Sequence, residues 1–479
     1  MILRDLFPGL TGEAGHAPVR GLTADSRKVE PGFVFAALQG VVADGRAYIP
    51  QAIAAGATAV LGKDLPAMDA AAIEADEPRL ALAQASARFY PQQPETIVAI
   101  TGTNGKSSTV DFLRQIWASS GLKAASMGTL GAIGPSGHID LGHTTPDPVA
   151  IHATLQALAA EGVQHAAMEA SSHGLAQYRL DAVKLGAVAF TNLTQDHLDY
   201  HGTMEEYRAA KTRLFSELAP KGVPAIVNAD SDQRLFFEQA ALDAGLAVVS
   251  VGWRGEDLKI EELMPKATGQ RLFVSWRGAK AAIDLPLIGE FQALNALTAA
   301  GLALAGGMEL QAVADGLAAL KPVKGRLEYV GETGQGAGVF VDYAHTPAGL
   351  DVLIRAARPH TAGRLVVVLG AGGDRDKGKR PQMGAIAAKH ADLVIVTDDN
   401  PRSEDPATIR AEIMTTVPNG IEIGDRGEAI AQAIAGLKKG DTLLIAGKGH
   451  ETGQIVGDTV IPFSDQETAL AALNEVANA

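Results

Sequence analysis

A glycine-rich loop between an expected strand and an expected helix contains residues that could bind a nucleotide triphosphate. The segment Thr101–Ser108 reads T-G-T-N-G-K-S-S and follows the apolar run Thr96–Ile100. Glycines let the backbone approach phosphate oxygens closely, and the amides at the start of the helix then face negative charge. Lys106 can neutralise the β- and γ-phosphates, and the hydroxyl of Ser107 can ligate Mg²⁺. The loop therefore predicts nucleotide phosphate binding, although Ile100 replaces the first glycine of the common pattern.

Two clusters of acidic and imidazole side chains follow this loop. Glu169 lies in Met168–Leu175 (M-E-A-S-S-H-G-L), and His197 lies in Asp196–His201 (D-H-L-D-Y-H). A single Glu or His at such a place is more often a structural hydrogen-bonding group than a metal ligand. Two such clusters after a phosphate loop favour a role in binding metal over a structural one, because phosphoryl transfer needs further Mg²⁺ ligands. Lys211, in the helix expected next, would by itself be taken for a surface lysine.

The elements that must position these residues form an α/β protein with mostly parallel sheets. Apolar strand-like runs alternate with helical patterns along the 479 residues, and a chain of this length usually forms two to four domains. We predict three domains: a small N-terminal α/β domain over 1–94, a central ATP-binding domain over 95–324 and a C-terminal doubly wound domain over 325–479. In the last domain polar loops follow apolar runs repeatedly, and open α/β sheets bind ligands at such strand ends.

The composition excludes several classes of function. The chain has 41 basic and 55 acidic residues and a formal charge of −14, which disfavours nonspecific binding to nucleic acid or a membrane surface. It contains no cysteine, so zinc–thiolate sites and cysteine nucleophiles are excluded. The first residues lack the apolar core of a signal peptide, and the longest apolar run, about 291–304, is too short to span a bilayer. We therefore expect a cytoplasmic enzyme.

The loop variant T-G-T-N-G-K-[ST]-[ST] resembles the phosphate loops of the Mur ligases and of the folylpolyglutamate synthases. Further segments resemble the Mur ligase family in the family's own order, among them 169–174, 196–201, 325–328 and 342–347. The resemblance covers all three expected domains. It implies an ATP-dependent amino-acid ligase of peptidoglycan synthesis, which uses Mg²⁺ and works through an acyl phosphate. Its expected substrates are ATP, UDP-MurNAc-L-Ala-D-Glu and meso-diaminopimelate.

The resemblance also implies roles for individual residues in the nucleotide site. ATP would be bound by Gly102, Thr103, Asn104, Gly105, Lys106, Ser107, Ser108, Asn295, Arg326, Asp342 and His345. The catalytic set would be Lys106, Glu169, His197, Lys211 and Arg326. The metal would be held by Ser107, Glu169, His197 and a carbamylated Lys211. Carbamylation requires a neutral amine, so the pocket must lower the pKa of Lys211.

Further positions resemble the family's contacts to its other two substrates. The UDP-sugar would be bound by Ser26, Val41, Val42 and Ala43, and its muramoyl-dipeptide end by Thr144, Thr145, Ser171, Gln177 and Arg179. The amino acid would be bound by Arg380, Asp399, Asn400, Pro401, Arg402, Gly447 and Glu451. The segment 399–402 reads D-N-P-R, the family motif associated with meso-diaminopimelate. Arg402 and Arg380 could bind its carboxylates, and Glu451 could bind its ammonium group.

Three alternatives to this function stay open in the sequence. The enzyme could add L-lysine or belong elsewhere among the Mur ligases, or it could be a folylpolyglutamate synthase. Segments 25–27 and 44–46 favour the UDP-muramoyl series, because the folate enzymes begin at the phosphate loop. A nucleotide-gated binding protein without turnover is the non-enzyme alternative, but binding alone would not need Glu169, His197 and Lys211 together. A dinucleotide fold at 370–375 is weak, since Arg375 replaces the last glycine of its pattern.

Overall fold

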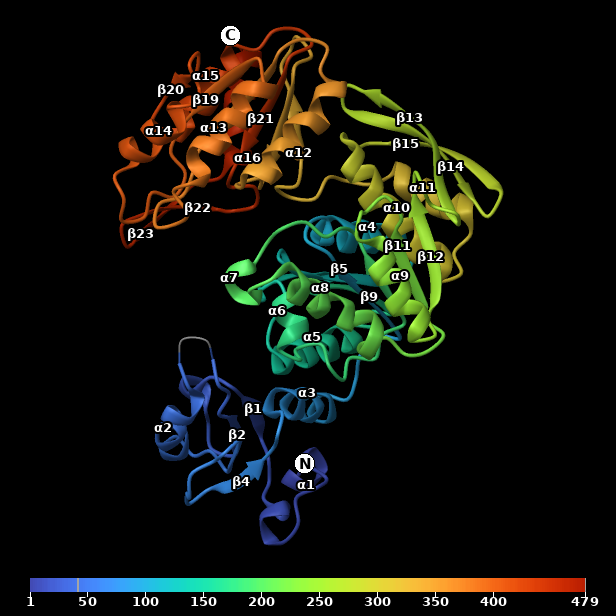
Figure 1. Cartoon of the computed structure of the whole chain (residues 1–479), viewed down its shortest axis with the longest axis vertical. Coiled ribbons are helices and arrows are strands. Elements are labelled where there is room, and N and C mark those ends of the chain that lie inside the picture. The colour runs from blue at the N-terminus through green and yellow to red at the C-terminus, as the bar shows by residue number, and fades with distance from the viewer. Residues whose placement is uncertain (41–42, 479) are drawn as a thin grey trace. The chain divides into compact units, whose positions relative to one another are not determined.

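The computed structural model describes residues 1–40 and 43–478, and its elements are labelled in Figure 1. The chain forms two compact units: unit 1 comprises Met1–Leu258 and Thr298–Glu309, and unit 2 comprises Lys259–Leu297 and Leu310–Ala479. The α/β class with mostly parallel sheets is confirmed. Unit 1 includes the whole first predicted domain and much of the second, so the division at 94/95 and 324/325 stays a prediction.

The first part of unit 1 is a small parallel sheet with the order β1-β2-β3-β4. Its strands are β1 (Gly21–Thr23), β2 (Phe33–Ala36), β3 (Ala59–Gly62) and β4 (Ala71–Glu74), and its helices include α1 (Leu3–Leu6), α2 (Ile49–Ala54) and α3 (Pro78–Phe89). Alternate residues of a strand face opposite sides of its sheet. Val34 and Ala36 accordingly pack in one apolar core, and Phe35 packs in another. The sheet is therefore buried on both faces.

The second part of unit 1 is built on a larger sheet in which six parallel strands are followed by two antiparallel ones. Within this unit the order is β12-β11-β10-β5-β9-β6-β7-β8. The strands are β5 (Thr96–Thr101), β6 (Ala124–Gly128), β7 (Gly131–Gly134), β8 (Gly137–Ile139), β9 (His165–Glu169), β10 (Ala187–Phe190), β11 (Pro224–Asn228) and β12 (Ala247–Gly252).

The helices around this sheet place the predicted motifs. They are α4 (Lys106–Ser119), α5 (Pro148–Ala160), α6 (Ser172–Ala176), α7 (Leu198–His201), α8 (Met204–Arg213) and α9 (Arg234–Asp243), while α10 (Glu290–Ala305) crosses the boundary between the units. Strand β5 lies between β10 and β9, and the chain leaves it in one direction to β6 and later crosses to β10 on the other side. Ligands bind open α/β sheets at such a reversal, at the carboxyl ends of the strands.

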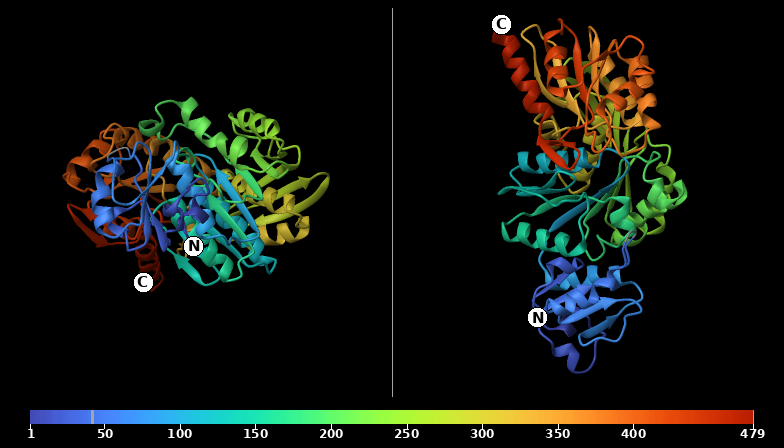
Figure 2. Two further views of the ribbon diagram at one scale, coloured as in Figure 1. Left: turned by 90° about the horizontal axis from the view of Figure 1, so that it is seen from below. Right: turned by 90° about the vertical axis from the view of Figure 1, so that its left-hand side faces the viewer.

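Unit 2 contains a doubly wound sheet with the order β16-β17-β21-β18-β19-β20, in which only β16 runs antiparallel to its neighbour. The strands are β16 (Glu328–Glu332), β17 (Gly338–Asp342), β18 (Leu365–Leu369), β19 (Leu393–Val396), β20 (Ile421–Glu422) and β21 (Thr442–Ala446). Helices cover both faces (Figure 2). On one face lie α12 (Pro347–Ala357), α13 (Lys379–His390) and α14 (Pro406–Met414), and on the other lie α15 (Arg426–Ala435) and α16 (Asp465–Asn478).

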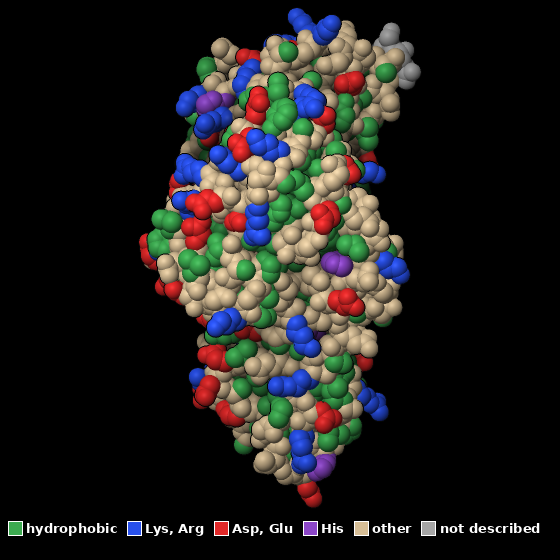
Figure 3. Space-filling view, turned by 90° about the vertical axis from the view of Figure 1, so that its right-hand side faces the viewer, with side chains coloured by type: hydrophobic (Ala, Val, Ile, Leu, Met, Phe, Trp, Pro, Cys, Tyr) green, Lys and Arg blue, Asp and Glu red, His purple; other side chains and the backbone are tan. Residues whose placement is uncertain are grey.

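The remaining elements of unit 2 lie outside this sheet. They are β13 (Leu258–Lys266), the antiparallel pair β14 (Gly269–Trp276) and β15 (Ala279–Leu285), helix α11 (Leu310–Ala318), and the hairpin β22 (Gly453–Val456) and β23 (Thr459–Pro462). In the part of the chain that the structure describes, no helix combines the length and apolar content that a bilayer crossing requires. On the face in Figure 3, acidic and basic side chains are interspersed over the surface.

Candidate active site

The phosphate loop joins the carboxyl end of β5 to the start of α4. Gly102 has a φ of +150°, and a Cβ atom there would lie 1.9 Å from the Thr191 hydroxyl. Gly105 has a φ of +86° and forms the N-cap of α4. No other residue type fits either position without strain. The two glycines therefore let the loop's backbone lead directly into the amino end of α4, where the free amide groups favour an anion.

Two kinds of contact hold the loop in place. The Nζ atom of Lys106 donates to the carbonyl oxygens of Gly102 at 2.9 Å and Thr103 at 2.8 Å. The loop also binds the segment after β10: the amide of Thr103 donates to the carbonyl of Asn192 at 2.8 Å, and the amide of Asn104 donates to its Oδ1 atom at 3.0 Å. The Thr191 hydroxyl donates to the Asn104 carbonyl at 2.6 Å. The loop is thus preformed rather than a flexible connection.

Lys211 lies in the interior and not on the surface, where it would be expected if it were an ordinary helical lysine. It is 1% exposed, and its Nζ atom donates to the Gly102 carbonyl at 2.8 Å and lies 4.7 Å from the centre of the Tyr207 ring. Burial lowers the pKa of Lys211 well below its ordinary range, and the charge of Lys106 lowers it further. A lowered pKa favours the neutral amine that carbamylation requires.

Glu169 and Ser107 line one small cavity beside the phosphate loop, together with Asp111, Ser126 and Gly128 among others. Glu169 is 2% exposed, and its Oε1 atom accepts a hydrogen bond from the amide of Thr129 at 2.8 Å. A Cβ atom on Gly128 would lie 2.1 Å from that oxygen. The structure thus brings together a hydroxyl and a carboxylate that were predicted as metal ligands.

Within residues 1–40 and 43–478, no group of three or more His, Asp or Glu side chains forms a ready metal site. Mg²⁺ commonly takes only one or two protein carboxylates and completes its shell with water and substrate phosphates. The cavity shared by Ser107 and Glu169 is small, and it offers a hydroxyl and a carboxylate, which are oxygen donors of the kind that Mg²⁺ takes. It does not fit a metal ion that is held by protein ligands alone.

His197 lies at the start of α7, with a φ of +52° and a side chain that is 47% exposed. Its ring centre is 4.9 Å from that of His173 and 6.2 Å from that of Tyr207. The hydroxyls of Tyr207 and Thr103 share a hydrogen bond of 3.0 Å. Burial and the nearby imidazoles lower the pKa of His173 to about 4. The sequence predictions did not include His173 and Tyr207, although both lie in or near the motifs.

Four of the five residues predicted for the muramoyl-dipeptide end form one hydrogen-bonded group: Thr145, Ser171, Gln177 and Arg179. The hydroxyl of Thr145 donates to the Glu169 carbonyl at 2.9 Å and accepts from the Ser171 amide at 3.1 Å. Arg179 donates to the Thr145 carbonyl at 2.6 Å and to the Gln177 side chain at 2.8 Å. Thr144, the remaining member, shares a 2.9 Å hydrogen bond with the Thr129 hydroxyl.

The residues predicted for the UDP-sugar are less fully described. Val41 and Val42 lie outside the described residues. Ser26 begins a short helical turn, where its hydroxyl donates to the Gln51 side chain at 3.3 Å. The carbonyl of Ala43 accepts from the Gly40 amide at 2.8 Å. Arg79, which was not predicted, donates to the Gln39 carbonyl at 2.6 Å and lies 3.5 Å from the Gln177 side chain.

In unit 2, the residues predicted for the nucleotide lie on adjoining segments. The guanidinium of Arg326 is 4.7 Å from the centre of the Tyr343 ring. Asp342 accepts from the amides of Leu327 at 2.6 Å and Ala344 at 2.7 Å. Burial raises the pKa of Asp342, while Arg326 and these amides oppose that rise. Asp342 therefore shapes the backbone beside Arg326.

The other two predicted nucleotide contacts of unit 2 are also held by neighbours. Asn295 donates to Gln292 at 3.0 Å, and Gln292 donates to the Arg326 carbonyl at 2.8 Å. Gln292 therefore ties Asn295 to the segment that contains Arg326. Nδ1 of His345 lies 2.8 Å from the Tyr343 carbonyl oxygen. Burial lowers the pKa of His345.

The residues predicted for the amino acid come together at the carboxyl ends of β19 and β21. Asn400 donates to the Glu451 carboxylate at 3.0 Å, and Lys448 donates to Asn400 and to Glu451 at 3.0 Å each. A Cβ atom on Gly447 would lie 2.6 Å from the Asp399 carboxylate. Lys448 was not predicted, although it lies between two residues that were. It supplies a cation beside the carboxylate that was predicted to bind the substrate's ammonium group.

Arg402 and Arg380, the two predicted carboxylate contacts, have different surroundings. Arg402 has a φ of +53° and donates to the main-chain carbonyl of Gly373 at 2.9 Å. Arg380 has no exposed side-chain surface and donates to Glu404 at 2.9 and 3.1 Å and to Glu412 at 2.8 Å. Its charge is already neutralised by two carboxylates. The prediction that Arg380 contacts the substrate stays a prediction, and its burial weighs against it.

Comparisons with known proteins match this chain over almost its whole length. Three family models match the chain. The model described as "Mur ligase family, catalytic domain" matches residues 18–96, and the "Mur ligase middle domain" matches residues 100–303. The model described as "Mur ligase, glutamate ligase domain" matches residues 325–449. A protein of Agrobacterium fabrum named UDP-N-acetylmuramoyl-L-alanyl-D-glutamate--2,6-diaminopimelate ligase is 50% identical and covers 99% of each chain. One of the same name from Brucella melitensis is 52% identical over 98% of this chain and 97% of its own. A solved structure of a ligase of that name is 31% identical, with a TM-score of 0.77 and 99% of each chain covered.

Proposed function

The chain belongs to the Mur ligase family, and from that membership we propose its reaction. The enzyme joins meso-2,6-diaminopimelate to the side-chain carboxylate of the D-glutamate in UDP-MurNAc-L-Ala-D-Glu, with ATP converted to ADP and phosphate. The observation that carries the proposal is the full-length identity of about half to ligases named for this reaction. The reaction belongs to peptidoglycan synthesis, and the cytoplasmic location expected from the sequence is part of the proposal.

The first step activates a poor acyl donor. The γ-phosphoryl group of ATP passes to the D-glutamate side-chain carboxylate, which becomes an acyl phosphate. The bond between the γ-phosphorus and the bridging oxygen breaks, and ADP is the leaving group. The protein's task is to position both groups and to neutralise their charge. Lys106, in the phosphate loop, is the cation proposed for the β- and γ-phosphates, and Arg326 is the second cation proposed for the γ-phosphate. Asn295, Asp342 and His345 are proposed for the nucleoside side.

Mg²⁺ is the metal proposed for this step, and it would neutralise negative charge on the phosphates. The cavity shared by Ser107 and Glu169 offers the oxygen ligands that Mg²⁺ prefers. Lys211, once carbamylated, adds an anionic oxygen group, and its nitrogen keeps one N–H that can still donate to the Gly102 carbonyl. The positive charge of Lys106 favours that anion. His197 completes the proposed set on the side of Tyr207.

The second step forms the amide bond. The amine of meso-diaminopimelate attacks the acyl carbon and a C–N bond forms. Inorganic phosphate leaves with the electron pair of the broken C–O bond, and it takes up the proton that the amine nitrogen loses. Asp399, Asn400, Pro401, Gly447 and Glu451 are proposed to bind the amino acid. Arg402 is proposed to bind the carboxylate that meso-diaminopimelate has and L-lysine lacks, because a guanidinium binds a carboxylate with two parallel hydrogen bonds. Arg380 is kept as a second proposed carboxylate contact, although its guanidinium is paired with Glu404 and Glu412.

The test is phosphate release measured with ATP, UDP-MurNAc-L-Ala-D-Glu and each candidate amino acid in turn. We expect release that depends on both substrates and is fastest with meso-diaminopimelate. Release with L-lysine instead would move the chain to another branch of the family. Release with a folate and glutamate would favour the folylpolyglutamate synthase alternative. ATP binding without any substrate-dependent release would favour a nucleotide-gated binding protein.

A further inference from the structure

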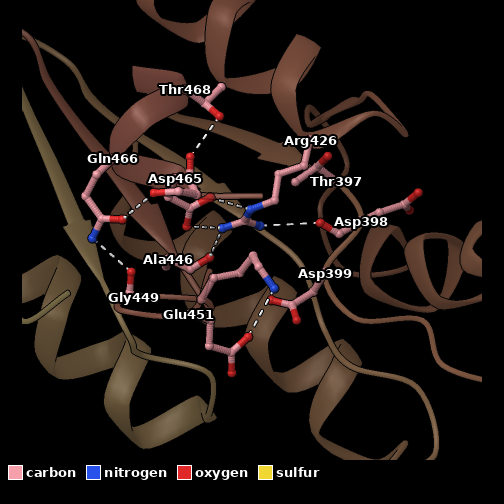
Figure 4. A network of polar contacts seen from close by, with 12 residues as sticks. Thr397, Asp398, Asp399, Arg426, Ala446, Gly449, Glu451, Asp465, Gln466 and Thr468 are labelled. Carbon is pink, nitrogen blue, oxygen red and sulfur yellow. Dashed lines mark hydrogen bonds and ion pairs between the residues drawn. The ribbon is translucent and has the colours of Figure 1, made fainter. Parts of the chain in front are cut away.

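A fully buried ion pair joins the first residues of two helices in unit 2 (Figure 4). Arg426 begins α15 and Asp465 begins α16, and neither side chain has exposed surface. The Nε and Nη2 atoms of Arg426 donate to the two carboxylate oxygens of Asp465 at 2.7 and 2.8 Å. A bidentate pair of this kind fixes the orientation of the guanidinium as well as neutralising its charge.

The other hydrogen bonds of this guanidinium reach two separate strand ends. Nη2 also donates to the carbonyl of Ala446, the last residue of β21, at 3.0 Å. Nη1 donates to the carbonyl of Asp398, just after β19, at 3.4 Å. The two strands are not neighbours, because β18 lies between them in the sheet. The two strands therefore share no hydrogen-bond ladder with each other, and side chains connect their loops directly: the guanidinium of Arg426 at the strand ends, and Asn400 with Lys448 and Glu451 further along the loops.

The two loops held in this way are the ones proposed to bind the amino acid, 399–402 and 447–451. They lie so close that any side chain at Gly447 would meet the Asp399 carboxylate. A small change in their spacing would therefore change the position of Asn400 relative to Glu451, which now share a hydrogen bond of 3.0 Å. The carboxylates of Asp399 and Glu451 also lie near enough to Arg426 to raise the pKa of its guanidinium.

The next residue of α16 extends the same connection. Gln466 donates to the Gly449 carbonyl at 2.9 Å and to the Glu328 carboxylate at 2.8 Å. Glu328 in turn accepts from the amide of Gly325 at 2.7 Å. The first turn of α16 is thus tied both to the loops of the amino-acid site and to the segment that contains Arg326.

We propose that Arg426 and Asp465 are positioning residues for the amino-acid substrate: they set the spacing of the loops 399–402 and 447–451 without touching the substrate. The inference rests on the proposed function, since it takes these loops to bind the amino acid. A buried ion pair adds little stability over an apolar pair of the same size. What an apolar pair cannot supply is a set of N–H donors that reaches Asp465, Ala446 and Asp398 together.

The test replaces the charges and keeps the volume, in the double variant Arg426→Met/Asp465→Leu. Removing both partners avoids leaving one buried charge alone, so the thermal unfolding temperature should stay near that of the parent. The KM for meso-diaminopimelate should rise about ten- to hundredfold, the size of effect expected when reacting groups are misplaced by about 1 Å. The KM for ATP should not change. Arg426→Lys keeps the charge but has fewer N–H donors, so its KM for meso-diaminopimelate should lie between that of the parent and that of the double variant.

The matched control is Arg364→Met/Asp441→Leu. In this pair Nε and Nη2 of Arg364 both donate to Oδ2 of Asp441, at 3.0 and 2.7 Å, and Nη2 also donates to the Gly436 carbonyl at 2.7 Å. The Arg364 side chain is 38% exposed, so the control removes an ion pair that is less buried than Arg426–Asp465. The control pair lies at the amino ends of β18 and β21, away from the loops. We expect an unchanged KM for meso-diaminopimelate in the control.

Each outcome has a distinct meaning. An equal rise of this KM in the control would mean general loosening of the sheet and would overturn the positioning role. An unchanged KM for meso-diaminopimelate in the folded double variant would also overturn the positioning role. If the double variant does not fold, Arg426→Lys decides the question in the same way. A parent enzyme that releases no phosphate in response to any amino acid would instead refute the proposed function itself.

Discussion

Lys211→Met removes the buried amine of α8 and keeps an unbranched side chain of similar length. The Nζ atom of Lys211 donates to the Gly102 carbonyl at 2.8 Å, and the residue is 1% exposed. If this hydrogen bond is the whole contribution of the amine, its loss costs about 0.5–1.5 kcal/mol, or roughly tenfold in activity at most. If the amine is carbamylated, the variant also loses an anionic ligand proposed to hold the Mg²⁺ that would neutralise the phosphate charge. We therefore expect a fall of about 10²- to 10³-fold.

The assay is phosphate release with all three substrates, made on variants whose thermal unfolding matches the parent's. Lys211→Ala leaves space beside the loop, and formate or acetate should partly restore its activity by replacing the missing anion. Lys106→Ala is the matched control, because it loses a cation from the same loop and a carboxylic acid cannot replace it. Native mass measurement in bicarbonate buffer should show carbon dioxide on the parent enzyme. A loss within tenfold for Lys211→Met, or a fully active parent without the added mass, would refute the reasoning.

Three further predictions follow from the same geometry. Lys106→Ala should abolish phosphate release in a folded protein, and ATP binding as tight as the parent's, measured by calorimetry, would contradict a direct phosphate role. Arg402→Ala should remove the preference for meso-diaminopimelate over L-lysine, since a charge-assisted pair in a closed site is worth about 2–5 kcal/mol; an unchanged preference in a competition assay would contradict the assignment. Arg380→Lys should lower the thermal unfolding temperature, because one amine cannot bind both Glu404 and Glu412 as the guanidinium does, and should leave the KM for meso-diaminopimelate unchanged. A large rise in that KM without loss of stability would show that Arg380 contacts the substrate.

The fold class and the phosphate loop could be predicted because short-range rules govern them. A buried parallel strand is a continuous apolar run, and a glycine loop before a helix is needed wherever a backbone approaches phosphates. The positions of Glu169 and of Asn400 could also be predicted, since the carboxyl ends of parallel strands meet at one edge of a sheet. The burial of Lys211 could not be read from its helix, because that burial comes from Tyr207 and from the loop at Gly102, which is 109 residues away in the chain.

The two arginines predicted for the substrate carboxylates show where sequence patterns stop being informative. Both lie in motif-like segments of unit 2, and either could bind a carboxylate. Arg380 is neutralised by Glu404 and Glu412, which lie 24 and 32 residues further along the chain, whereas Arg402 donates to the main chain at Gly373. A motif identifies candidate arginines, but residues further along the chain, here Glu404 in a loop and Glu412 on α14, decide which charge is already paired. The same argument applies to Arg426. Its guanidinium pairs with Asp465 and also donates to the carbonyls of Asp398 and Ala446, and no local sequence pattern indicates that these positions are connected.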